Sequence, residues 1–130
     1  MKTGFHYWRL VIVLAAGLFA AGTLWAAAPF DEARFAAAQQ AGKPILLQVH
    51  ADWCTTCRAQ EPVIEALLKE PAYAEFVVFR VDFDRQKDVL KRLLVPFQST
   101  LVVFKGDTEV SRSTAQVSRE VIAGELAKAL

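Results

Sequence analysis

Two cysteines, Cys54 and Cys57, lie in this 130-residue chain where a short apolar run meets a segment with helical periodicity. The apolar run, 45–50, predicts a buried strand, and the spacing of apolar residues over 55–70 predicts a helix. A chain that passes directly from strand to helix here places both thiols in the first helical turn. Two thiols at that spacing can close a small disulfide ring and reopen it with little movement of the chain.

The start of a helix favours a thiolate over a thiol, because unpaired backbone N–H groups and the positive end of the helix dipole lie there. Cys54 stands at this start, whereas Cys57 is one turn further in and is expected to be more buried. We therefore predict that Cys54 is the attacking nucleophile and Cys57 the resolving thiol in dithiol–disulfide exchange. The pair itself is then the redox centre, and no further cofactor is expected.

Three other interpretations of the pair are open. Two cysteines at this spacing can form half of a zinc site, but four ligands are usual and no second pair follows; His50 offers a third ligand. The pair could be a structural disulfide, although so short a loop restrains the unfolded chain least. It could also be two reduced core cysteines. Motif and context together favour the redox interpretation, without a metal.

The first 28 residues differ from the rest of the chain. Lys2 and Arg9 lie in a short basic start without acidic residues, and 10–24 is almost wholly apolar. This pattern is typical of a secretory signal peptide. The apolar stretch 10–28 is also close to the length of about 20 residues that crosses a bilayer, so an uncleaved anchor is the alternative. Both interpretations predict export to the periplasm, either free or anchored to the inner membrane and facing the periplasm.

Small residues at 26–28 suit cleavage, after Ala28 or, because Pro29 is a poor residue after a cut, after Ala26. The predicted second region, 29–130, is long enough for one small domain. Without Lys2 and Arg9, thirteen basic residues remain against fourteen acidic ones. This balance does not favour nucleic acid as a partner. A membrane contact is expected only through 10–28, if that segment is retained.

Hydrophobic periodicity and turn residues give the expected order of helices and strands. We expect helix 30–41, strand 45–50, helix 55–70, strand 76–83, helix 84–94, strand 101–104, strand 109–113 and a closing helix 118–130. The last two strands are separated by a short turn and should form a hairpin. The fold class is therefore α/β, in a single domain.

With the motif and this order, the chain resembles the thioredoxin-fold family, of the exported thiol-disulfide oxidoreductase type. The matching sequences are Gly42-Lys43-Pro44, Ala51-Asp52-Trp53-Cys54-x-x-Cys57, Pro62 and Leu101-Val102-Val103-Phe104-Lys105-Gly106. The resemblance implies a mixed, roughly four-stranded sheet flanked by helices, with Cys54 exposed at the helix tip. It also implies protein thiol or disulfide clients and a redox partner that regenerates the pair.

The chain departs from the family in the loop that faces the active-site pair. Where the family usually has a cis proline, this chain has Ser99, between Gln98 and Thr100. A cis bond before a non-proline residue costs about 2.5–4 kcal/mol, so the peptide bond before Ser99 should be trans. The resemblance makes Gln98, Ser99 and Thr100 the substrate-binding loop, with client binding altered by the loss of the proline.

A second departure is Gln48, which stands where thioredoxins often have a buried acid beneath the resolving cysteine. His50 lies on the same strand face and is a candidate replacement or a stabiliser of the thiolate; a strand histidine bonded to neighbouring backbone is the alternative. Trp53 and Asp52 could shape the client groove, or they could merely pack and cap. Arg80 and Asp82 could modulate the electrostatic field at the site, although a solvated pair is the default expectation.

Two further functions remain open beside the enzyme. One is a binding or chaperone module that keeps the fold and uses the cysteines as a structural disulfide. The other is a carrier of a soft metal ion such as copper(I), held by Cys54, Cys57 and His50. The direction of electron flow and the identity of the client do not follow from the sequence.

Overall fold

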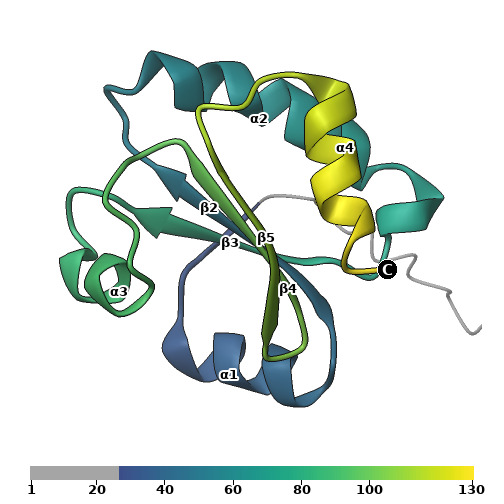
Figure 1. The fold of residues 1–130 in the computed structure, drawn as a ribbon. Coiled ribbons are helices and arrows are strands. Elements are labelled where there is room, and N and C mark those ends of the chain that lie inside the picture. Colours follow the sequence, from purple (N-terminus) through teal and green to yellow (C-terminus); the bar gives the residue numbers. More distant parts are fainter. Residues whose placement is uncertain (1–26) are drawn as a thin grey trace, which may run out of the picture.

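The computed structural model describes residues 27–130 (Figure 1). The predicted signal or anchor segment, except for its last two residues, therefore lies outside the described residues. Within 27–130, no helix is both long enough and apolar enough to span a membrane.

A mixed five-stranded sheet forms the centre of the domain (Figure 1). Its strands follow the spatial order β1-β3-β2-β4-β5, with β1 and β2 parallel to β3 and with β4 antiparallel to β2 and β5. The strands are β1 (Ala28–Pro29), β2 (Pro44–His50), β3 (Val77–Asp82), β4 (Thr100–Lys105) and β5 (Thr108–Thr114). The four longer strands confirm the prediction from sequence.

The fifth strand, β1, was not predicted. It is only two residues long, and it pairs Ala28 with Phe79 and Pro29 with Arg80. Neither periodicity nor β-propensity reveals so short a strand, because the contact with β3 determines it. The sheet also begins one residue before the predicted domain start at residue 29.

Helices cover both faces of the sheet (Figure 1). They are α1 (Glu32–Gln40), α2 (Thr55–Leu68), the single 3₁₀ turn η1 (Pro71–Tyr73), α3 (Lys87–Arg92) and α4 (Arg119–Ala127). Side-chain caps begin three of them, since Asp31, Cys54 and Ser118 each accept a backbone N–H of the first turn. The four predicted helices are thus confirmed, with shorter bounds.

Each face of the sheet has its own apolar cluster. Helices α2 and α4 pack Ile64 and Leu126 against β2 and β4, whereas α1 and α3 pack Phe35 and Leu90 against the opposite face. Alternate residues of β2 point into the two clusters, Leu46 to the α2 side and Leu47 to the α1 side. This two-sided burial explains why β2 and β4 are almost continuously apolar in sequence.

Helix α3 is much shorter than the predicted helix 84–94. The Asp82 carboxylate accepts the backbone N–H groups of Asp84 and Arg85, which makes a turn after β3 and delays the helix to Lys87. At the other end, Leu94 adopts a left-handed φ of 54°, which an α-helix cannot contain. Polar turn chemistry therefore overrides the helical periodicity of this segment.

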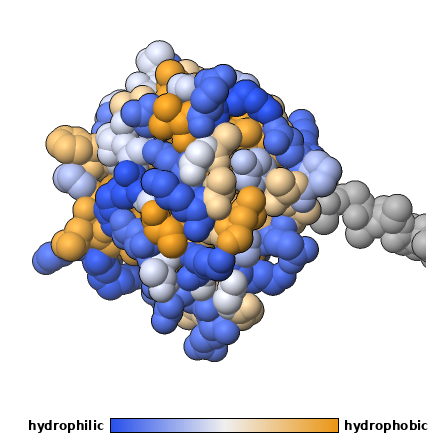
Figure 2. Space-filling view, turned by 45° about the vertical axis from the view of Figure 1, so that its right-hand side comes forward, coloured by the Kyte–Doolittle hydropathy of each residue, from blue (hydrophilic) through white to orange (hydrophobic). Residues whose placement is uncertain are grey.

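Apolar side chains on the face of the molecule in Figure 2 are scattered among polar ones. Among residues 27–130, the large apolar side chains that remain more than two-fifths exposed are Trp53, Leu94, Phe97, Val117, Val121 and Leu130. Two of these, Trp53 and Phe97, belong to the segments around the cysteine pair.

Candidate active site

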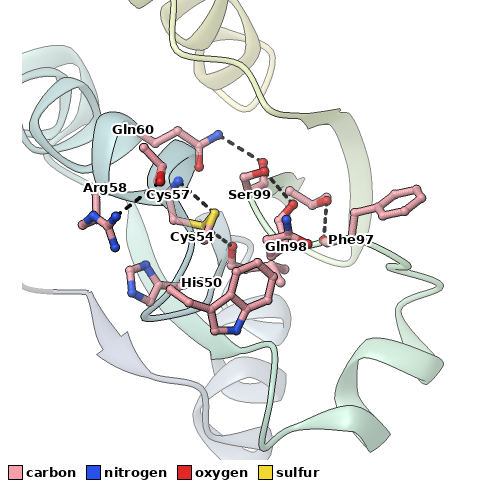
Figure 3. Close-up of a disulfide and its surroundings, with 12 residues drawn as sticks. His50, Cys54, Cys57, Arg58, Gln60, Phe97, Gln98 and Ser99 are labelled. Atoms are coloured by element: carbon pink, nitrogen blue, oxygen red, sulfur yellow. Dashed lines mark hydrogen bonds between the residues drawn. A yellow bond between two sulfur atoms is a disulfide. The ribbon is translucent and has the colours of Figure 1, made fainter.

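Cys54 and Cys57 are joined as a disulfide at the start of α2, with their Cα atoms 5.3 Å apart (Figure 3). Cys54 is the residue that caps the helix, in an extended conformation, and Cys57 lies in the first turn. The backbone N–H of Cys57 donates to the Cys54 sulfur at 3.1 Å. The first turn of the helix therefore directs a donor at the sulfur that we predict to be the nucleophile.

The turn before Cys54 is also tied to the helix. Arg58 donates to the Asp52 carbonyl at 2.8 Å and to the Thr55 hydroxyl at 3.3 Å. The backbone N–H of Cys54 donates to the Ala51 carbonyl at 3.0 Å. These bonds hold the passage from β2 to α2 in one shape, so the two sulfurs keep their positions.

In the oxidised protein Cys54 is 3% exposed and Cys57 is fully buried. The expectation that Cys54 is exposed at the helix tip is therefore wrong for this state. The physical reason is packing, because both sulfurs lie in a small cluster with Ala51, against which Phe83 packs. Cys57 is the more buried of the two, as predicted.

The Ser99 loop lies directly beside the disulfide. The backbone N–H of Ser99 donates to the Val49 carbonyl at 2.9 Å, and the Cys57 sulfur lies 3.8 Å from the same oxygen. A disulfide sulfur carries no hydrogen, so the second contact becomes a hydrogen bond only when Cys57 is reduced. The structure thus brings the predicted loop and the predicted resolving cysteine to one backbone carbonyl.

Within this loop, the peptide bond before Ser99 is trans, in agreement with the prediction. Ser99 itself is buried and has a left-handed φ of 54°. Its hydroxyl donates to the Gln98 carbonyl at 2.6 Å, and the Thr100 hydroxyl donates to the Phe97 carbonyl at 2.8 Å. Ser99 and Thr100 are therefore internal supports of the loop, whereas Gln98 and Phe97 are more exposed.

Trp53 is 57% exposed, and it packs against a neighbouring ring at the surface. Its indole N–H donates to the Asp84 carboxylate at 2.9 Å, and its ring meets Phe83 edge to face at 6.3 Å between centroids. Lys87 lies over the other aromatic ring, 3.9 Å from the Phe83 centroid. A large aromatic side chain next to Cys54 is thus held in a defined orientation at the surface.

His50 and Gln48 lie on the face of β2 that packs against α2. Buried His50 has its Nδ1 atom 3.6 Å from the Glu61 carboxylate and its Nε2 atom 3.5 Å from Asp52. Nδ1 lacks a hydrogen-bond partner within the described part of the chain, as does Nε2 of buried Gln48. The alternative of a histidine bonded to neighbouring backbone does not describe this site, where carboxylates are its polar neighbours.

Arg80 pairs with Glu61 across the gap between β3 and α2. The expected pair of Arg80 with Asp82 is therefore wrong, because Asp82 instead supports the turn that precedes α3 and approaches Arg85 at 3.7 Å. Residues 80 and 82 are two positions apart in β3 and share a face of the sheet, but each side chain contacts another partner.

A cavity of about 20 Å³ lies beneath this ion pair. It is lined by Gln48, Glu61, Arg80 and Ile64, among others. A volume of this size holds about one water molecule when polar partners are present. The cavity, the buried Gln48 amide and the partly exposed Arg80–Glu61 pair form a polar region beside the active-site helix.

The sequence argument missed four residues that the structure brings to this site: Gln60, Glu61, Asp84 and Phe97. Gln60 and Glu61 follow Cys57 at three and four positions, the spacing that puts residues on one helix face, so that signal was available. No local pattern indicates Asp84 or Phe97, because their places depend on loops that meet the site from elsewhere.

Within residues 27–130, no group of three or more His, Cys, Asp and Glu side chains is arranged to hold a metal ion. The proposed ligand set of Cys54, Cys57 and His50 is thus not brought together in the disulfide form. The roles of Cys54 as nucleophile and Cys57 as resolving thiol remain predictions, which this geometry allows.

Comparison with known proteins places this site in a family. The family model "Thioredoxin" matches residues 27–128. Thioredoxin from Alicyclobacillus acidocaldarius is 30% identical over 100 residues, which are 76% of this chain and 93% of that protein. An H-type thioredoxin from Fagopyrum esculentum is 34% identical over 79 residues, which are 61% of this chain but only 66% of that protein.

Among solved structures, that of Trxlp from Edwardsiella tarda is similar, with a TM-score of 0.75 and 38% identity. The match covers 78% of this chain and 98% of that one. The matched region contains the whole sheet and the Cys54–Cys57 disulfide at the start of α2. The chain belongs to the thioredoxin family of protein-disulfide oxidoreductases.

Proposed function

We propose that the protein exchanges disulfides with protein partners in the bacterial envelope through Cys54 and Cys57. The observation that carries this proposal is the capping of α2 by Cys54, whose sulfur accepts the Cys57 backbone N–H at 3.1 Å. That donor and the helix dipole favour the thiolate of Cys54 in the reduced protein.

The proposed reaction proceeds in two displacements. In the reducing direction, the Cys54 thiolate attacks a client disulfide, forms a mixed disulfide and releases the first client thiolate. The Cys57 thiolate then attacks the Cys54 sulfur, which closes the Cys54–Cys57 disulfide and releases the second client thiolate. The client gains two electrons and the pair loses two. In the oxidising direction the same steps run in reverse.

A separate dithiol or disulfide protein must return the pair to its starting state after each turnover, because the pair alone carries only two electrons. Thioredoxins act without a further cofactor, and we propose the same for this chain. Protein clients suit the surroundings of the pair, where Trp53 and Phe97 expose apolar rings beside a buried disulfide.

Single-cysteine variants test this chemistry. Cys57→Ser should accumulate a mixed disulfide with a protein client, because the resolving step is lost, while Cys54→Ser should form none. Non-reducing electrophoresis followed by mass spectrometry identifies the trapped sulfur. A Cys54→Ser protein that still exchanged disulfides with a dithiol substrate would disprove the assignment.

Thiol titration across a series of redox buffers separates the enzyme from the binding module. An enzyme interconverts dithiol and disulfide at accessible potentials, whereas a structural disulfide stays closed throughout. Metal analysis of the anaerobically purified, reduced protein tests the copper(I) carrier, for which stoichiometric metal bound through the two thiols is required.

The envelope location rests on the basic and apolar pattern of residues 1–28. Fractionation of cells that express the full chain tests it, and the intact mass of the isolated protein separates a cleaved signal from a retained anchor. The β1 pairing of Ala28 with Phe79 favours a cut after Ala26 over one after Ala28, since the earlier cut leaves the strand whole.

A further inference from the structure

Gln60 is a fully buried glutamine in the active-site helix, one turn after Cys57. The neighbouring buried positions of α2 toward the C-terminus, Ile64 and Leu67, are apolar. Burying an amide without hydrogen bonds is costly. Within residues 27–130 the Oε1 atom of Gln60 has no hydrogen-bond partner, so the hydrogen bonds that offset this cost are those of its Nε2 atom.

Both partners of Gln60 are backbone carbonyls in loops beside the site. Its Nε2 atom donates to the Ser99 carbonyl at 3.1 Å and to the Gln116 carbonyl at 2.8 Å (Figure 3 shows the first). Ser99 immediately precedes β4, and Gln116 lies between β5 and α4. One amide group thus connects the cysteine-bearing helix to two loops that are distant in sequence.

The Ser99 loop needs such support. Ser99 and Ala115 have left-handed φ values of 54° and 62°, which are unfavourable for residues with a Cβ atom. The Ser99 carbonyl accepts the Ala115 N–H at 3.0 Å as well as the Gln60 amide, and the Ser99 N–H donates to Val49. A residue persists in a strained conformation when its surroundings over-determine it, and these three bonds do so.

From these contacts we infer that Gln60 is a positioning residue that sets the shape of the predicted substrate-binding loop 98–100, and of Phe97 before it, relative to the disulfide. The inference rests on the proposed exchange with protein clients. Gln60 acts through Ser99, whose N–H shares the Val49 carbonyl with the Cys57 sulfur. A client segment that reaches Cys54 meets this loop, where Phe97 is 59% exposed and Gln98 is partly exposed.

The variant Gln60→Met tests the inference, because methionine has nearly the same length and lacks the N–H donors. We expect the KM for a protein substrate to rise about five- to tenfold, the effect of losing a hydrogen-bonded contact, with kcat changed less than about twofold. Insulin serves as substrate in the reducing direction and reduced, unfolded ribonuclease in the oxidising direction, whichever the wild type supports.

Three measurements distinguish positioning from a purely structural role. The rate with 2-hydroxyethyl disulfide should stay at the wild-type value, because a small disulfide does not need the loop. The equilibrium potential of the Cys54–Cys57 pair should also stay at the wild-type value, because the Gln60 amide donates to neither sulfur. Amide hydrogen exchange at Ser99 and Ala115 should become faster. Ile64→Val, a mild core substitution one turn further along α2, is the matched control and should leave the KM unchanged.

Should Gln60→Met fail to fold, Gln60→Asn retains the amide on a side chain one carbon shorter, and it should raise the KM by an intermediate factor. A wild-type KM in either variant, measured where the wild type is active, would overturn the inference and leave the proposed function intact. A wild-type protein inactive toward insulin, ribonuclease and the small disulfide would instead overturn the proposed function, and the inference with it.

Discussion

The Cys54 sulfur accepts the backbone N–H of Cys57 at 3.1 Å, so the first cysteine caps the helix that carries the second. A thiolate at this position gains a stronger, charge-assisted hydrogen bond than a neutral sulfur does. The same geometry closes the disulfide and favours the ionised form of Cys54 after reduction. The relationship therefore leads to a direct chemical test.

In the reduced protein we expect iodoacetamide to modify Cys54 at least about tenfold faster than Cys57 at neutral pH, because the thiolate is the nucleophile. Peptide mapping by mass spectrometry after short reaction times measures both rates. In urea-unfolded protein the difference should disappear, since it depends on the helix. Faster modification of Cys57, or equal rates in the folded protein, would contradict the assignment.

Trp53 should contribute to client binding more than to stability. Trp53→Phe retains a ring against Phe83 but removes the indole N–H bond to Asp84. We expect a KM for a protein substrate raised about threefold to tenfold, and a free energy of unfolding lowered by less than about 1 kcal/mol. Steady-state kinetics and urea denaturation measure these effects. Asp84→Asn is the control, because it keeps an acceptor oxygen for the indole N–H of Trp53. If the KM of Asp84→Asn were as high as that of Trp53→Phe, the hydrogen bond between Trp53 and Asp84 would not be the cause of the effect.

Glu109 should make stability depend on pH in acid. Its hydrogen bonds with Arg112 hold the pKa of the Glu109 carboxyl below its usual range, and Arg112 also donates to the Leu93 and Leu94 carbonyls. Because the pKa of Glu109 is lower in the folded state, ionised Glu109 stabilises the protein at pH values above its unfolded-state pKa of about 4.3. This stabilisation is lost as the pH falls through the folded-state pKa. The side chain is 37% exposed, so solvent screening limits the effect to less than about 1 kcal/mol.

Glu109→Gln removes this contribution. We expect it to destabilise the protein at pH 7 and to cost less at about pH 3, below the unfolded pKa, because protonation of Glu109 removes the same charge. Urea denaturation at the two pH values measures the difference. Glu65→Gln, at an exposed position of α2, is the control and should show no such change. An equal loss at both pH values would mean that the charge of Glu109 is not the cause.

Phe30 should be essential to the core despite its place at the edge of the domain. It is 8% exposed, and its ring lies 5.4 Å from that of Phe35 and 5.9 Å from that of Phe79, between centroids. Phe30→Ala should lower the free energy of unfolding by about 3–5 kcal/mol, measured by denaturant titration. Val121→Ala, at a 43% exposed site, should change it by less than about 0.5 kcal/mol. A loss below about 1 kcal/mol for Phe30→Ala would place the working boundary of the domain after this residue.

Much of this protein was determined by its sequence alone. Local signals predicted the elements around the site: the apolar runs of β2 and β4, Gly42 after α1 with Pro44 at the start of β2, and the spacing of the two cysteines. Together these signals also indicated the family. The position of Cys54 at the helix start is equally local, because the strand to helix transition follows from the same short segment.

The tertiary structure alone decided which side chains meet around the pair. Ser99 reaches Val49, Gln60 joins two loops, Arg80 pairs with Glu61 instead of Asp82, and Trp53 is held by Asp84. Each contact joins segments far apart in the chain, and neither periodicity nor propensity describes such a distance. The burial of Cys54 follows for the same reason: exposure depends on what packs over a residue, which only the folded chain determines.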